Sequence, residues 1–177
     1  MKFTFFPKLD FSLTMIWGCV LSNIVLLAFL FWADLFGKVD GLSTGRGPLF
    51  VAVAISLCAI YFILEFIVNI PNSHASIARL ALASVLLIGV IILSYANIYS
   101  QIYELYGTDA FKSGSLSAGD FLYYSITTFT ATGYGDITSI SAVSNGFAAS
   151  EMLIGFLLNS ILIAVVAWKL LQSKKDE

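Results

Sequence analysis

Long apolar segments constrain this chain more than any other feature of its sequence. They cover roughly residues 13–36, 48–70, 75–99 and 146–171, and an extension of the third to residue 106 is the alternative. Each is long enough to cross the hydrocarbon core of a bilayer, which takes about 20 helical residues. Charged residues are 11% of the chain and hydrophobic residues 59%, whereas a soluble domain carries about 25% charged residues. The sequence therefore predicts an all-α, multi-pass membrane protein with four transmembrane helices.

Composition and motif content exclude several classes of function. The net charge of −2 is too small to indicate a nucleic-acid partner. Cys19 and Cys58 both lie within apolar segments, where free thiols pack as small hydrophobic groups. His74, the single histidine, lies in a short polar turn without metal-ligating neighbours. No nucleophile lies beside a base, so the sequence predicts no enzyme, no catalytic residue and no cofactor.

A polar stretch and a short helical segment separate the third and fourth apolar segments. Residues 118–129 predict a helix, with Ser117 as its N-cap and Asp120 three residues later. This helix is too short to cross a bilayer, but it suits a re-entrant segment buried by protein or lined by water. Its C-terminal end would point into the membrane, where the negative end of the helix dipole favours a cation.

A glycine-containing loop, residues 130–137, follows the short helix. Glycines at alternate positions can turn successive carbonyls the same way, because glycine adopts dihedral angles that other residues cannot. A ring of carbonyls replaces the hydration shell of the ion in potassium channels. The run Gly133-Tyr134-Gly135-Asp136 matches the core filter motif of those channels residue for residue. The chain resembles the pore-domain family of potassium channels over roughly residues 76–171.

This resemblance implies a potassium-selective channel subunit that conducts passively and assembles as a homotetramer in membrane lipid. Four copies of one filter would form a ring, and K⁺ would bind only at the filter carbonyls, as the permeant ion. The ion-binding residues would be Ala131, Thr132, Gly133, Tyr134 and Gly135.

Two filter positions depart from the family pattern. Ala131 stands where the family has its innermost threonine, and Thr132 stands where it has valine. Ala131 keeps its carbonyl but lacks the hydroxyl, so we expect a weaker innermost ion site with potassium selectivity retained. A weakly selective monovalent cation channel is the alternative. A non-conducting accessory subunit is an alternative from a different class.

The resemblance also assigns residues that support the filter. In the family, an aromatic residue of the pore helix bonds the aspartate after the filter, which corresponds here to Tyr123 and Asp136. The alternative is that this tyrosine and Tyr124 simply pack. Thr127 stands where some members carry an acid that reaches the same aspartate, so that second brace is expected to be absent or weaker.

The last apolar segment contains a stripe of residues at a regular four-residue spacing. Glu151, Gly155, Asn159 and Ile163 recur every four residues, so they share one helix face. Lipid tolerates Glu151 and Asn159 poorly, so this face should meet protein or water. We expect Glu151 behind the filter against the pore helix. We expect Asn159 to line a water-filled cavity, and we assign Gly155, Asn159 and Ile163 to the cavity and gate. Gly155 lies where the family has its hinge glycine, and the alternative is close helix packing.

The chain divides into residues 1–74, with two transmembrane helices of unassigned role, and residues 75–177, the pore domain. Glu65 and Arg79 lie at equal distances from the turn between the second and third segments. We expect them to pair within the membrane, and separate snorkelling to the interface is the alternative.

The basic residues predict the orientation of the chain in a cell membrane. Six of them fall on the side of both termini and three on the opposite side. By the positive-inside rule, both termini are cytoplasmic and the filter faces outward. The six are Lys2, Lys8, Arg79, Lys169, Lys174 and Lys175, and the three are Lys38, Arg46 and Lys112.

Overall fold

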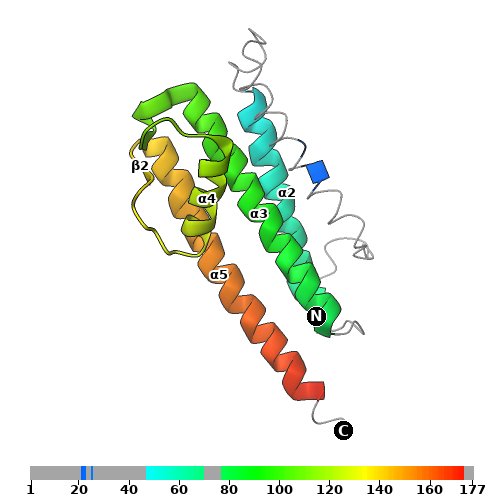
Figure 1. The fold of residues 1–177 in the computed structure, drawn as a ribbon. Helices are drawn as coiled ribbons and strands as arrows, with labels where there is room; N and C mark the ends of the chain where they lie inside the picture. Colours follow the sequence, from blue (N-terminus) through cyan, green and yellow to red (C-terminus); the bar gives the residue numbers. More distant parts are fainter. Residues whose placement is uncertain (1–20, 23–24, 26–46, 70–76, 174–177) are drawn as a thin grey trace.

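The structure is a computed structural model that describes residues 21–22, 25, 47–69 and 77–173 (Figure 1). Its elements are mostly helical and are joined by short loops. In chain order they are α2 (Gly47–Asn69), α3 (Ile77–Tyr106), the 3₁₀ turn η2 (Gly107–Asp109), β1 (Phe111–Lys112), α4 (Ala118–Phe129), β2 (Thr138–Ser139) and α5 (Ala142–Ser173).

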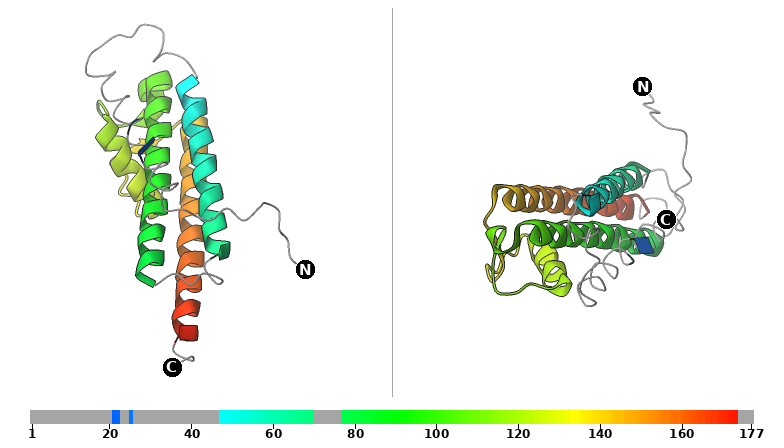
Figure 2. Two further views of the ribbon diagram at one scale, coloured as in Figure 1. Left: turned by 90° about the vertical axis from the view of Figure 1, so that its right-hand side faces the viewer. Right: turned by 90° about the horizontal axis from the view of Figure 1, so that it is seen from above.

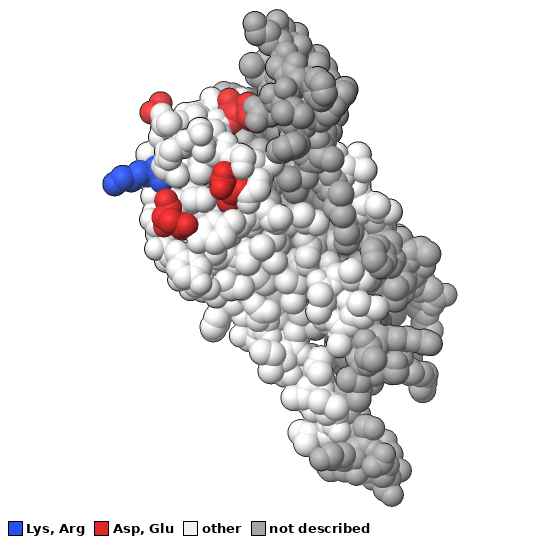
Figure 3. All heavy atoms as spheres, in the orientation of Figure 1, with Lys and Arg blue, Asp and Glu red and all other residues white. Residues whose placement is uncertain are grey.

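Three long helices run side by side, and α3 packs against α2, α4 and α5 (Figures 1 and 2). Two stretches, Ala81–Asp109 and Ala142–Trp168, are long and apolar enough to cross a membrane. The described charged side chains gather at the end of the molecule formed by the loops around α4, while the visible surface along the helices is uncharged (Figure 3). This distribution suits helices surrounded by lipid with one polar end in water.

The short helix α4 confirms the predicted bounds, and α3 follows the longer alternative by continuing to Tyr106. The last helix begins at Ala142, so the predicted start at residue 146 was wrong. The reason is a serine cap, because the backbone N–H of Ser144 donates to Ser141 Oγ at 3.1 Å. The predicted first segment, residues 13–36, lies almost entirely outside the described residues.

Two short strands were not anticipated by the all-α interpretation. β1 pairs antiparallel with β2, with Phe111 opposite Ser139 and Lys112 opposite Thr138. Two-residue strands are too short to leave a periodic pattern in the sequence. The Ala110 carbonyl extends this connection, because it accepts bonds from the Ile140 N–H at 2.9 Å and from Ser144 Oγ at 2.8 Å. The segment after residues 130–137 is therefore attached to the segment before α4.

An aromatic cluster fills the core between α3, β1 and α4. Tyr99 and Phe111 are fully buried, and Phe121 is nearly so. The ring centroids of Tyr99 and Tyr124 lie 4.9 Å apart, and those of Phe111 and Phe121 lie 5.3 Å apart, both edge-on. Edge-to-face pairs of this kind add to the stabilisation that burial provides. The cluster fixes α4 against α3, and so fixes the origin of the loop that follows α4.

Candidate functional site

The N-terminal end of α4 is closed by its own side chains. The Ser117 N–H and Ser117 Oγ both donate to one oxygen of Asp120, at 2.8 and 2.7 Å. These hydrogen bonds, first from the hydroxyl and then from the backbone, lower the pKa of Asp120 below its ordinary value. A carboxylate in the first turn also interacts favourably with the helix dipole. The predicted cap at residues 117–120 is therefore present.

The C-terminal end of α4 holds the loop that follows it. The Thr127 carbonyl accepts from the N–H groups of Thr132 at 2.8 Å and Gly133 at 3.3 Å, and the Thr128 carbonyl accepts from Ala131 at 3.0 Å. The loop's first N–H groups thus satisfy the carbonyls that a helix end leaves unpaired. Thr127 acts here through its carbonyl, while its hydroxyl donates back to Tyr124 O at 3.0 Å and not to Asp136.

Every second residue of the loop has a left-handed backbone. The φ angles are 54° at Ala131, 54° at Gly133 and 81° at Gly135. A Cβ added at either glycine would meet nothing within 4 Å, so glycine is required there by its backbone conformation and not by space. Ala131 is the only non-glycine residue with positive φ in the described part of the chain.

The carbonyls of residues 131–135 accept no backbone hydrogen bond within the described part of the chain. Residues 131–136 are all exposed in the single chain. A loop with its early N–H groups bonded backward and its carbonyls free offers several oxygen ligands in a row. Oxygen ligands of this kind suit a hard, dehydrated cation.

Tyr123 and Asp136, predicted to meet, are brought together by the structure. The hydrogen bond from Tyr123 to the Asp136 carboxylate raises the pKa of Tyr123 above its ordinary value. The ring of Tyr123 also stacks on that of Tyr134, with centroids 6.3 Å apart and planes 9° apart. Tyr134 is 71% exposed despite this contact. The two tyrosines and the aspartate therefore form one unit that connects α4 with the centre of the Gly-Tyr-Gly segment and with the residue that follows it.

A threonine pair at the start of the loop was missed by the sequence reasoning. Thr130 Oγ1 donates to the Ile126 carbonyl at 2.8 Å, so its oxygen is left to accept from Thr132 Oγ1 at 2.9 Å. Valine at position 132 would lack this bond. The signal in the sequence was the spacing of the two threonines, whose hydroxyls meet across Ala131.

Glu151 and Gly155 of α5 contact α4 one turn apart. Glu151 is fully buried and lies against Ser125 and Tyr99, as described below. A Cβ at Gly155 would lie 2.2 Å from the Phe129 carbonyl oxygen. Both pairs are separated by 26 residues, so α4 and α5 run alongside each other in register. This contact favours the close-packing alternative for Gly155, while its action as a hinge stays a prediction.

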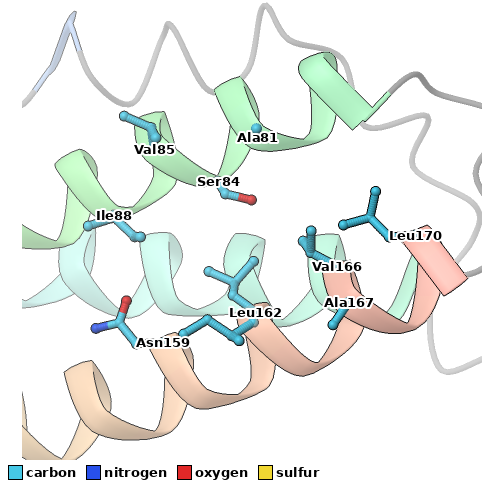
Figure 4. A pocket seen from close by; sticks show the side chains of 10 residues that line it. Ala81, Ser84, Val85, Ile88, Asn159, Leu162, Val166, Ala167 and Leu170 are labelled. Carbon is cyan, nitrogen blue, oxygen red and sulfur yellow. The ribbon is translucent and has the colours of Figure 1, made fainter.

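Asn159 and Ile163 continue the stripe into a groove between α3 and α5 (Figure 4). The groove has a volume of about 470 Å³ and is otherwise lined almost entirely by apolar side chains. Ile163 is 71% exposed. In the single chain these two residues therefore face a lateral groove, and their predicted place at a central cavity remains untested.

The predicted pair of Glu65 and Arg79 belongs to α2 and α3, but the described side chains do not include either residue. Their pairing stays a prediction. Among the described residues, no group of three or more His, Cys, Asp or Glu residues could hold a metal ion. The free carbonyls of residues 131–135 are the clearest row of unbonded backbone oxygens in the described part of the chain.

Two helices in the described part of the chain are long and apolar enough to cross a membrane. Residues 80–172 match the family model described as "Ion channel", and the chain belongs to this ion channel family, which is potassium-channel-like. The two helices together with the family match indicate a helical membrane protein. Searches of the curated proteins and of the solved structures found no match to the chain. Family membership points to a channel and not to an enzyme.

Proposed function

We propose that the protein is a potassium-selective channel subunit and that four copies surround one pore. The observation that carries this proposal is the alternation of left-handed φ at Ala131, Gly133 and Gly135. Together with the unbonded carbonyls, it gives each copy a row of oxygens available to a cation. One copy supplies one side of a coordination shell, so several copies are needed to replace the water around K⁺.

The surroundings of the loop suit a dehydrated cation. The last carbonyls of α4 carry the negative end of its dipole, although Thr127 and Thr128 already accept bonds from the loop. The Tyr123–Asp136 bond braces the outer end of the loop, and the threonine pair braces its inner end. Conduction then consists of K⁺ moving between neighbouring carbonyl sites, each favourable enough to enter and weak enough to leave.

The exposed surface of α5 supports an assembly. Only 22% of the apolar stretch of α5 that could cross a membrane is buried inside the single chain, against 50% of the corresponding stretch of α3. This exposed apolar surface includes Met152, Leu153, Phe156 and Leu157. Copies packed through α5 would cover this surface and bring four loops together, with lipid around the outer helices.

The proposed orientation places this assembly in the cell membrane with the filter outward and the termini in the cytoplasm. The acidic side chains at the loop end support it, since Asp109, Asp120 and Asp136 would raise the cation concentration at the outer mouth. The basic residues at positions 79, 169, 174 and 175 would lie at the opposite, inner surface.

A weakly selective cation channel is the second candidate, and Ala131 is the observation that favours it. Ala131 supplies a carbonyl in the left-handed conformation but no hydroxyl at the innermost position. Fewer oxygens at one site lower its affinity for K⁺. The intact Gly-Tyr-Gly carbonyls support retained selectivity.

A flux assay with purified protein in liposomes tests the proposal. Potassium and sodium gradients are compared for the wild type, for Gly133→Val and for the matched control Gly114→Val. Both glycines have open space around a built Cβ, but only Gly133 has a positive φ. Valine is strongly disfavoured at positive φ, so Gly133→Val should abolish a potassium flux that Gly114→Val preserves. Equal potassium and sodium fluxes would favour the second candidate, and no flux from wild type would contradict conduction under these conditions.

A further inference from the structure

Glu151 is a fully buried carboxyl group in a membrane helix. No cationic side chain among those described contacts it, and its partners are the hydroxyls of Tyr99 and Ser125. An ionised carboxylate buried without a counter-charge is costly, and more so at membrane depth. Burial alone therefore favours the uncharged form, and the positions of the hydrogen bonds add an independent argument.

The single hydroxyl proton of Ser125 distinguishes the ionised from the protonated form of Glu151. Ser125 Oγ lies 2.8 Å from the Ile92 carbonyl oxygen and 2.5 Å from Glu151 Oε1. The carbonyl only accepts, and the serine hydroxyl has one proton to donate. If Glu151 were ionised, one of these two short contacts would join two acceptors. If Glu151 carries a proton on Oε1, it donates to Ser125, and Ser125 donates to Ile92.

The other carboxyl oxygen fits the same arrangement. Tyr99 donates its hydroxyl proton to Glu151 Oε2 at 2.6 Å. Every donor then has an acceptor, in one direction, from Tyr99 through Glu151 and Ser125 to the Ile92 carbonyl. A fully satisfied buried network of this kind fixes the relative position of the groups that form it.

We propose that Glu151 is protonated at neutral pH and acts as a positioning residue that joins α3, α4 and α5 through this directed chain of hydrogen bonds. The chain begins and ends on α3 and passes through α5 and α4. Its effect on conduction rests on the proposed function, while the protonation state does not.

The next turn of the contact between α4 and α5 connects Glu151 with the filter. Gly155 lies against the Phe129 carbonyl, and the Thr127 and Thr128 carbonyls hold the first N–H groups of the loop. A shift of α5 at Glu151 would therefore move α4, and with it the inner end of the loop. The carboxyl of Glu151 determines how the inner helix and the filter are aligned.

Infrared spectroscopy of the full chain in liposomes at neutral pH tests the protonation state. The wild type should show a carbonyl stretch of a protonated carboxylic acid that Glu151→Gln removes and the control Asp120→Asn keeps. Tyr99→Phe and Ser125→Ala should each shift this band, because each removes one partner of the acid. A wild-type spectrum with carboxylate bands alone would overturn the proposal, as would a band that neither partner variant shifts.

Potassium flux tests the positioning role with two variants of similar size. Glutamine reproduces one donor and one acceptor, so Glu151→Gln should keep flux within about twofold of wild type. Leucine leaves the Tyr99 hydroxyl without an acceptor, while Ser125 keeps its bond to the Ile92 carbonyl. Glu151→Leu should therefore lower flux roughly tenfold, as expected for one unpaired buried group. Equal losses in both variants would contradict a neutral donor. If Glu151→Leu does not fold, the infrared bands of the other variants still decide whether Glu151 is protonated. The infrared result also holds if the wild type does not conduct, because it does not depend on the proposed function.

Discussion

The backbone carbonyl of Phe129 occupies the space that a side chain at Gly155 would need, since a built Cβ would lie 2.2 Å from its oxygen. The obstacle is backbone at the end of α4 and not the flexible end of a side chain. One of the two helices must therefore move if position 155 acquires a Cβ. Because α4 carries the filter loop, this contact links helix packing with the geometry of the candidate ion sites.

Gly155→Ala should lower the unfolding temperature, with a cost of about 1–3 kcal/mol from overpacking. Gly146→Ala is the matched control, because Gly146 lies in the same helix with nothing within 4 Å of a built Cβ. Alanine there should be neutral or stabilising by about 0.5–1 kcal/mol. Thermal unfolding followed by circular dichroism measures both. An unfolding temperature that stays the same in Gly155→Ala while channel opening slows would favour the hinge interpretation.

Thr132→Val should weaken the inner end of the filter, because valine keeps the shape but removes the hydroxyl that meets Thr130 Oγ1 at 2.9 Å. One lost hydrogen bond corresponds to about 1 kcal/mol. Thr130→Val and the double variant complete a double-mutant cycle. The ratio of potassium to sodium flux should fall in each single variant, and the double variant should be little worse. Fully additive effects would show that the two hydroxyls act separately.

Tyr123→Phe should lower potassium flux at neutral pH, because it removes the bond to Asp136 and keeps the ring that stacks on Tyr134. The neutral phenol makes this bond, and its pKa is raised from the ordinary 10.0 by Asp136. The stabilisation is therefore complete below about pH 10 and is lost as pH rises through the raised pKa of Tyr123. The flux difference between wild type and variant should disappear over that alkaline range. A difference that does not change with pH would assign the effect to packing.

Ser117→Ala should destabilise the start of α4 by about 1 kcal/mol. The Asp120 carboxylate accepts from Ser117, and its pKa is lowered from the ordinary 3.8. The associated stability is present above pH 3.8 and is lost as pH falls through the lowered pKa of Asp120. Acid unfolding followed by circular dichroism should show a larger free energy of unfolding for wild type than for the variant. This difference should shrink as the pH falls below 3.8. The variant Asp109→Asn, in the 3₁₀ turn η2 and outside α4, should leave this difference unchanged.

Local signals predicted much of the fold. Ser117 and Asp120 identified the start of α4, and the alternating glycines indicated the left-handed positions 133 and 135. The left-handed backbone of Ala131 was not predicted, because alanine has no such preference. The start of α5 was missed, because its serine cap lies in a stretch that reads as a polar loop. The contacts of Glu151 with Ser125 and Tyr99 span 26 and 52 residues, and no local pattern specifies such pairs. The stripe on α5 indicated a face that meets protein, but not which atoms lie opposite.

The Ala110 carbonyl, which accepts from Ile140 and Ser144, closes residues 110–140 into a ring that contains α4 and the loop that follows it. Residues 113–115 belong to this ring, lie between β1 and α4, and are exposed. The β1–β2 pairing holds one end of this loop, and the aromatic cluster holds α4 at the other. The loop can therefore be lengthened without moving α4, because loop entropy rises slowly with length. A fluorophore or an affinity tag inserted at Gly114 would report from the end of the molecule formed by the loops around α4 (Figure 3) and leave the alignment of residues 131–135 undisturbed.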